Sequence, residues 1–154
     1  MSGKPDGPYS LEGHADDVVQ LMDSLHISSG TLVGTSYGSE VAMEFALKYP
    51  HRCTSLVLID GVSELDLVLT CAAESWMAAA ALDARVFYRT LIPWNYSHGY
   101  LEKNLDKLRE REDLVASFPS EYFQGFIHLC EAFLKIDLTH RLQEIHVPTL
   151  VVVG

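Results

Sequence analysis

The chain has 154 residues, of which 48 % are apolar and 21 % are charged. This balance is that of a globular domain and excludes a disordered or collagen-like chain. Eleven Lys and Arg against twenty-one Asp and Glu give a net charge of −10, which argues against nucleic acid and anionic membranes as partners.

The first sixty residues alternate between helical and strand patterns. From Ser10, apolar residues recur at spacings of three and four, which predicts a capped helix that ends at 28–30. β-prone runs at 31–34 and 55–60 enclose a second apolar stripe at 41–49, which a proline ends. Helix, strand, helix and strand in this order predict an α/β fold with a parallel sheet.

Residues 62–146 have helical patterns instead. An alanine-rich run at 71–92, a leucine stripe at 101–115 and a segment at 121–135 are each typical of a helix. The β-branched run at 148–154 then predicts one more buried strand. We therefore expect a core at 1–61, a helical insertion at 62–146 and a returning core strand at 147–154.

One motif carries chemistry, the G-x-S-x-G pattern Gly34-Thr35-Ser36-Tyr37-Gly38. A strand is predicted before it and an amphipathic helix after it, which is the context of a nucleophile elbow. The serine is expected on a sharp turn with strained backbone angles, and side chains at either glycine are expected to collide with the neighbouring strand and helix. The N–H of Tyr37 could stabilise an oxyanion. The alternative is a glycine-rich turn with an idle serine.

The stretch from YSLEGHADDVVQ to SLVLIDG, residues 9–61, resembles the α/β-hydrolase fold family around its nucleophile. IHVPTLVVVG, residues 145–154, is similar to the later strand that leads to the catalytic acid in that family. Residues 62–146 stand where the family has a helical cap. The resemblance therefore implies a partial α/β-hydrolase fold with Ser36 as the nucleophile.

The family's catalytic residues follow in the order Ser, Asp or Glu, then His. The resemblance places the acid and the histidine beyond Gly154, and a second oxyanion donor before Met1. We therefore expect a segment of a longer hydrolase, a shortened gene product or one half of a two-chain assembly. Asp60 is either an alternative acid or a turn residue before a glycine.

The strands at 31–34 and 148–154 are expected to be open, apolar sheet edges, since the family's sheet has neighbours for both. Such edges could pair with a second copy or with a complementing chain. The alternative to catalysis is thus a non-catalytic remnant that binds a small apolar ligand or a partner.

A serine at the nucleophile position implies acyl transfer to water, because dehalogenases and epoxide hydrolases of this family have aspartate there. The substrate would be a small apolar ester, lactone or thioester. Eleven of the fifteen aromatic residues lie at 76–133 and either pack the helices or line an apolar pocket over Ser36. The pocket candidates are Trp76, Trp94, His98, Phe126 and His128; the two histidines are also the candidate bases.

No P-loop, HExxH or paired CxxC motif occurs, so we expect neither a cofactor nor a metal. The three cysteines are widely spaced and odd in number, which does not fit a disulfide framework. The first ten residues are polar, unlike a secretory signal, and no apolar run has the length of a membrane span. These features predict a cytoplasmic protein.

Overall fold

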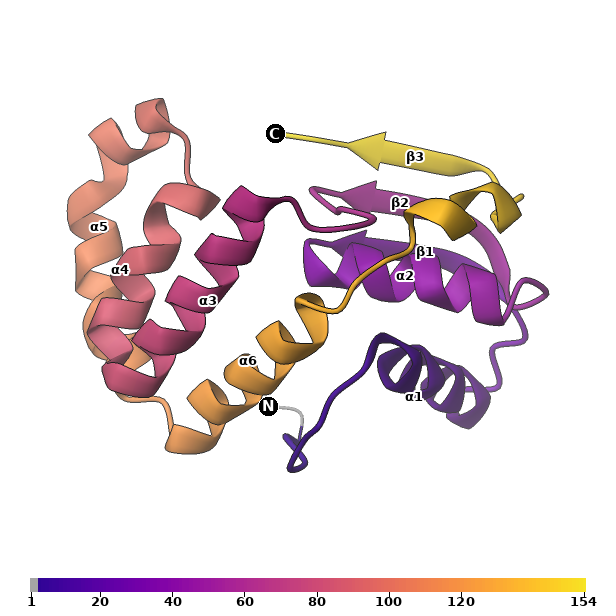
Figure 1. The fold of residues 1–154 in the computed structure, drawn as a ribbon, viewed down its shortest axis with the longest axis horizontal. Coiled ribbons are helices and arrows are strands. Elements are labelled where there is room, and N and C mark those ends of the chain that lie inside the picture. Colours follow the sequence, from indigo (N-terminus) through magenta and orange to yellow (C-terminus); the bar gives the residue numbers. More distant parts are fainter. Residues whose placement is uncertain (1–2) are drawn as a thin grey trace. The chain divides into compact units, whose positions relative to one another are not determined.

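A computed structural model describes residues 3–154 (Figure 1). Two compact units make up this part of the chain. The sheet unit comprises Tyr9–Asp66 and Ala132–Gly154, and the helical unit comprises Leu67–Glu131 with the residues up to Pro8. In chain order the elements are α1 Leu11–Ser24, β1 Gly30–Thr35, α2 Tyr37–Lys48, β2 Cys53–Ile59, α3 Leu67–Leu82, α4 Ala84–Asn95, α5 His98–Ala116, α6 Ser120–Phe133, the 3-10 helix η1 Thr139–Glu144 and β3 Thr149–Val152.

The sheet is parallel and has the order β1-β2-β3, which confirms the predicted α/β class. β2 is the central strand, so β1 and β3 are the edges among the described residues, as expected. Across the sheet, Val33 is in register with Val57 and Val57 with Leu150. Because partners in register share a face, these three side chains form one row on the sheet.

Helix α2 packs on β1 and β2, and α1 packs on α2 (Figure 1). Ser10 caps α1 as predicted, since its Oγ accepts the N–H of Gly13 at 3.0 Å. Phe45 of α2 and Leu56 of β2 are almost completely buried and form the centre of this packing. The sheet face opposite α2 is bare: Val33 is 65 % exposed and Leu150 58 %.

The helical unit is built on two helix pairs, α3 with α4 and α4 with α5. Phe87 of α4 is its most buried aromatic side chain and contacts the rings of Phe123 and Phe126. The prediction of one continuous helix over 71–92 was wrong. Asp83 accepts the N–H groups of Arg85 and Val86 and so begins a new helix.

The expected domain boundaries 61/62 and 146/147 stay a prediction, and the two compact units meet at 66/67 and 131/132. The segment after α6 belongs to the sheet unit, because Ile136 and Leu138 are buried there. Arg141 of η1 also forms an ion pair with Glu44 of α2, with a distance of 3.2 Å between nitrogen and oxygen. The ion pair attaches η1 to α2, and the Leu138 N–H donates to the carbonyl of Ser63 in the same unit.

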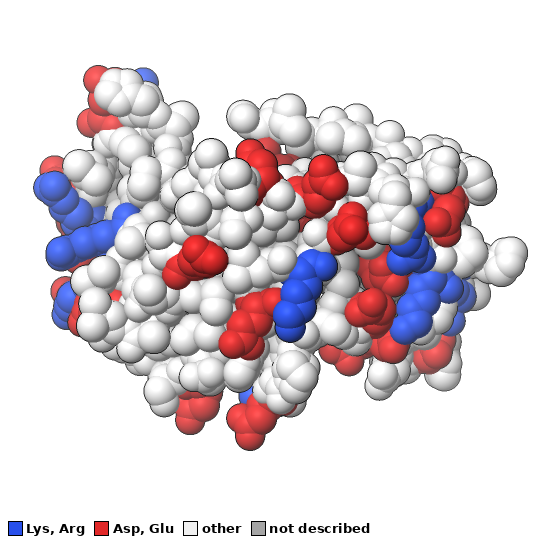
Figure 2. All heavy atoms as spheres, viewed as in Figure 1, with Lys and Arg blue, Asp and Glu red and all other residues white. Residues whose placement is uncertain are grey.

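Acidic side chains are spread over the face shown in Figure 2, with basic ones among them. The strip along the top of that view, where β3 lies in Figure 1, carries no charge. Within residues 3–154, no helix is both long and apolar enough to cross a membrane.

Candidate active site

The turn at Ser36 joins the end of β1 to the start of α2. Ser36 has a φ of 51° and a ψ of −130°, so the expected strained turn is present. A positive φ costs a residue with a Cβ about 1–3 kcal/mol and is found mainly where function requires it. The Ser36 N–H donates to the carbonyl of Ile59 at 2.8 Å, which fixes the turn to β2. Its hydroxyl is exposed and does not cap α2, so it is available to a substrate.

The two glycines of the motif differ in the space around them. A Cβ on Gly34 would lie 2.1 Å from the carbonyl oxygen of Gly38 and 2.6 Å from the Cα of Ser39. Alanine cannot fit there, because both contacts are to backbone. The expectation of a similar collision at Gly38 was wrong: a Cβ on Gly38 would meet no heavy atom of the described residues within 4 Å. The carbonyl group of Gly38, which any residue at that position would carry, is what lies against Gly34.

Tyr37 is the first residue of α2, and the first N–H groups of a helix have no acceptor within the helix. Its amide therefore has no acceptor among the described residues and is a donor beside Ser36. The side chain is anchored separately: its hydroxyl lies 3.0 Å from Nδ1 of His14, and its ring packs edge-on against Phe133. Burial, and then the nearby charge of Glu40, raise the pKa of Tyr37. The phenol therefore stays neutral and acts as a structural anchor.

Asp60 follows Ile59, the residue in register with Thr35, so it lies beside Ser36 at the carboxyl ends of the strands. It has a φ of 50°. Its N–H donates to Val152, and its Oδ1 accepts the N–H of Gly154 at 2.8 Å. Asp60 thus links β2 to the end of β3, and its assignment as an alternative acid stays a prediction.

Within the sheet unit, no histidine hydrogen-bonds to Ser36. Nδ1 of His14 lies 3.0 Å from the hydroxyl of Tyr37. His98 is exposed and lies 3.4 Å from Glu102, whereas His128 is half-buried with Nδ1 3.1 Å from Glu131. A base for Ser36 is therefore not assigned within residues 3–154.

The pocket candidates of the helical unit take part in different contacts. Trp76 and Trp94 form an edge-to-face pair with ring centroids 5.4 Å apart. Phe126 packs on Phe87 within the core of the unit, with centroids 4.6 Å apart. Two open cavities of this unit, of about 550 and 240 Å³, are lined by other residues: Arg89, Ile92, Leu105, Arg109 and Glu112, and Tyr88, Leu91, Ile92, Asn95 and Tyr96. An apolar pocket over Ser36 stays a prediction.

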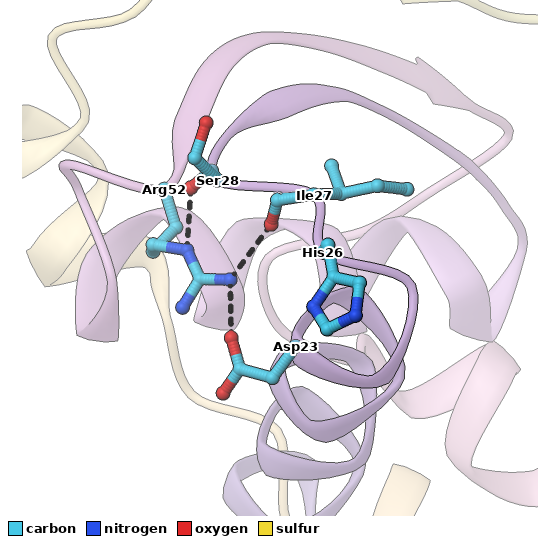
Figure 3. A pocket seen from close by; sticks show the side chains of 5 residues that line it. All are labelled: Asp23, His26, Ile27, Ser28 and Arg52. Atoms are coloured by element: carbon cyan, nitrogen blue, oxygen red, sulfur yellow. Dashed lines mark hydrogen bonds and ion pairs between the residues drawn. The ribbon is translucent and has the colours of Figure 1, made fainter.

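A third hollow lies where β1 and β2 begin (Figure 3). The guanidinium of Arg52, which lines this hollow, donates to the carbonyls of Ser28 and Ile27 and to Oδ1 of Asp23, at 2.6–3.0 Å. These bonds use the guanidinium of Arg52 to hold the end of α1 and the loop that leads to β1. In parallel sheets ligands bind at the carboxyl ends of the strands, which is where Ser36 lies and this hollow does not.

Sequence reasoning missed Glu40, a carboxyl group one turn into α2. It is 1 % exposed, and its Oε1 accepts the N–H of Val62 at 2.6 Å. The available signal was an acidic residue directly before the apolar stripe Val41–Ala46. Among residues 3–154, no group of three or more His, Cys, Asp or Glu side chains is arranged to hold a metal ion.

Comparison with known proteins assigns the family. The family profile described as "alpha/beta hydrolase fold" matches residues 2–154, nearly the whole chain. Together with the parallel sheet and the turn at Ser36, this shows that the chain belongs to the α/β-hydrolase fold family, in the partial form that the sequence predicted.

Two curated proteins are similar in sequence to most of this chain. The chain is 30 % identical over 151 residues to a protein of Azorhizobium caulinodans named as a carbamate hydrolase, RutD, covering 97 % of this chain and 56 % of the relative. It is 27 % identical over 161 residues to 3-oxoadipate enol-lactonase 2 of Acinetobacter baylyi, with coverages of 99 % and 56 %. The chain thus spans a little over half the length of these relatives.

Solved structures agree with this. MGS-M2, an α/β-hydrolase enzyme from a deep-sea metagenome library, superposes with a TM-score of 0.90 at 25 % identity, covering 98 % of this chain and 56 % of that one. The enol-lactonase of Burkholderia xenovorans gives a TM-score of 0.79 at 25 % identity, with coverages of 96 % and 55 %.

Proposed function

We propose that this chain carries the nucleophile of a serine hydrolase that cleaves carboxylic esters, lactones or thioesters through an acyl-Ser36 intermediate. The observation that carries the proposal is the backbone of Ser36, which has a positive φ between β1 and α2 and an exposed hydroxyl with no capping role. A protein tolerates such a conformation at a non-glycine residue mainly where the side chain has to be presented.

In the proposed reaction the Ser36 oxygen attacks the acyl carbon and its proton passes to a general base. The N–H of Tyr37 stabilises the negative oxygen that forms, with support from the dipole of α2. The leaving alcohol or thiol departs, and water then releases the acid and restores Ser36. The family resemblance assigns the base to a histidine later in chain order, so the proposal gives this chain the nucleophile and one oxyanion donor.

The names of the relatives support an acyl substrate. A carbamate and an enol lactone both contain a carbonyl carbon bonded to a heteroatom, and a serine nucleophile attacks that kind of centre. The two relatives are each about 30 % identical to the chain and are named for different substrates of this class. Their names therefore support the reaction type for this chain more strongly than they support a carbamate or an enol lactone as its substrate.

A fluorophosphonate probe tests the proposal, because it modifies serine hydroxyls that act as nucleophiles. We expect slow labelling of the folded chain, because the base is assigned to a histidine outside it. We expect loss of labelling in Ser36→Ala and wild-type labelling in Ser29→Ala, an exposed serine outside the turn. Circular dichroism checks that each variant is folded. A folded chain that does not label, or a Ser36→Ala variant that still does, contradicts the assignment.

The bare sheet face favours a second candidate, the binding of a partner. Val33, Leu150 and Val152 are 65 %, 58 % and 42 % exposed and lie on two edge strands. Exposed apolar edges of this kind pair readily with other chains, either a second copy or a complementing polypeptide. Light scattering after size exclusion tests the pairing of two copies, since a compact monomer at all concentrations contradicts that pairing.

A further inference from the structure

Glu40 is a buried carboxyl group whose place in the site the proposed reaction does not explain. It lies four residues after Ser36 on α2 and is 1 % exposed. Its Oε1 accepts the N–H of Val62 at 2.6 Å, while Oε2 is buried and has no partner among the described residues. Buried polar atoms are nearly always paired, so a half-paired carboxyl group requires a reason.

The segment that Glu40 binds is packed closely on the first turn of α2. A Cβ on Gly61 would lie 2.3 Å from Cβ of Ser39 and 3.5 Å from Oε1 of Glu40. The hydroxyl of Ser39 donates to the carbonyl oxygen of Gly34 at 2.9 Å, and its Oγ accepts the N–H of Ile59 at 3.1 Å. Ser39 therefore holds the strand ends, and the bond to Val62 holds the chain that follows them.

This segment contains Asp60 and adjoins the elbow. Asp60 lies beside Ser36 by the strand register, and the Ser36 N–H donates to the residue before it. We propose that Glu40 is a positioning residue: by holding Val62 against α2, its carboxyl group sets where Asp60 and the Tyr37 N–H lie relative to Ser36. The consequence for Ser36 rests on the proposed function, whereas the contact with Val62 does not.

The protonation state of Glu40 gives this contact a measurable signature. Burial raises the pKa of Glu40 to about 7, against the lowering effect of the Val62 N–H. The ionised form accepts the stronger bond from Val62. The other titratable groups around this turn are Tyr37 and the paired Glu44 on α2, Asp60 after β2, and Glu12 and His14 on α1. Tyr37 stays neutral, since burial and the charges of Glu40 and Glu12 raise its pKa.

The first experiment follows the backbone amides of Gly61 and Val62 by NMR as the pH is varied. We expect the Val62 resonance to titrate with a midpoint near 7 in the wild type and not in Glu40→Gln. Glu44→Gln is the matched control, because Glu44 is also buried on α2 but pairs with Arg141. A Val62 amide that does not respond to pH, or that responds equally in Glu40→Gln, overturns the proposal.

The second experiment measures the rate of fluorophosphonate labelling. Glu40→Leu removes the acceptor, so we expect labelling to fall by about tenfold and the Val62 amide to exchange faster with solvent. Glu40→Gln keeps an acceptor, so its labelling should be close to that of the wild type but lack the inflection near pH 7. Wild-type labelling in Glu40→Leu with unchanged exchange at Val62 overturns the proposal. If the wild type never labels, the proposed function fails, and the amide titration still decides the role of Glu40.

Discussion

Replacing Gly34 by alanine is expected to be among the most destabilising small substitutions in the sheet unit. The new Cβ would lie 2.1 Å from the Gly38 carbonyl oxygen and 2.4 Å from its carbon. Both are backbone atoms that cannot rotate away, so relief requires α2 to move from β1 by roughly 1 Å. That movement also disturbs the bond between Ser39 Oγ and the Gly34 carbonyl.

The magnitude follows from these contacts. Overpacking a rigid site costs about 1–3 kcal/mol, and contact with backbone places Gly34→Ala at the upper end. Loss of chain entropy in the unfolded state offsets about 0.4–1 kcal/mol. We therefore expect the free energy of unfolding to fall by about 2 kcal/mol, measured by urea denaturation with circular dichroism.

Gly38→Ala is the matched control, four residues away in the same motif. Its Cβ would enter open space, and alanine is favoured over glycine in a helix by up to about 1 kcal/mol. We expect this variant to be as stable as the wild type or slightly more stable. A Gly34→Ala variant within about 0.5 kcal/mol of the wild type, or equal losses in both variants, would refute the packing argument.

Three further measurements test other parts of the structure. The pKa of Glu40 is raised from 4.5 to about 7, so its contribution to stability is complete below pH 4.5 and is lost as the pH rises through 7. Glu40→Gln should therefore gain stability relative to the wild type by about 3 kcal/mol between pH 4.5 and pH 8, and an equal difference at both pH values contradicts this. Phe87→Ala should destabilise the helical unit by about 3–5 kcal/mol in thermal or urea unfolding, whereas Val86→Ala, on the exposed side of α4, should cost much less. Arg52→Lys keeps the charge but cannot bond to both carbonyls and Asp23, so it should lower the free energy of unfolding by about 1 kcal/mol; no change would show that the α1–β1 connection does not depend on the guanidinium.

The part of the fold around the elbow could be predicted from sequence because several local signals agree there. Ser10 marks a helix start, the apolar stripes have a helical period, and the β-branched runs are short. The motif Gly34–Gly38 then indicates how strand and helix are joined. Each of these signals depends on residues close together in sequence. They therefore predict the elements around the elbow even though the chain covers a little over half of its relatives' length.

What sequence could not predict depends on contacts between distant residues. The structure shows that a Cβ on Gly34 would collide with the carbonyl of Gly38, whereas a Cβ on Gly38 would not collide. The sequence has glycine at both positions and therefore cannot show which of the two is sterically required. The attachment of η1 to the sheet unit rests on the pair Arg141–Glu44, which joins residues 97 apart. The helix break at Asp83, in contrast, was readable, since aspartate is a preferred N-cap.

The role of Glu40 was hidden for a related reason. A glutamate at the fourth position after a helix start is common and usually solvent-exposed. Only the path of the chain after β2, which brings the Val62 N–H to its Oε1, turns it into a buried group.

The backbone at position 36 also restricts which amino acid could ever take the place of the serine. Threonine carries the same hydroxyl, but its branched Cβ is strongly disfavoured at a φ of 51°. Serine, cysteine and aspartate each have a single substituent on Cβ, so branching does not exclude them. The backbone conformation at position 36 therefore permits serine, cysteine or aspartate as the nucleophile and excludes threonine. The reaction at this turn can change only among the chemistries of those three side chains.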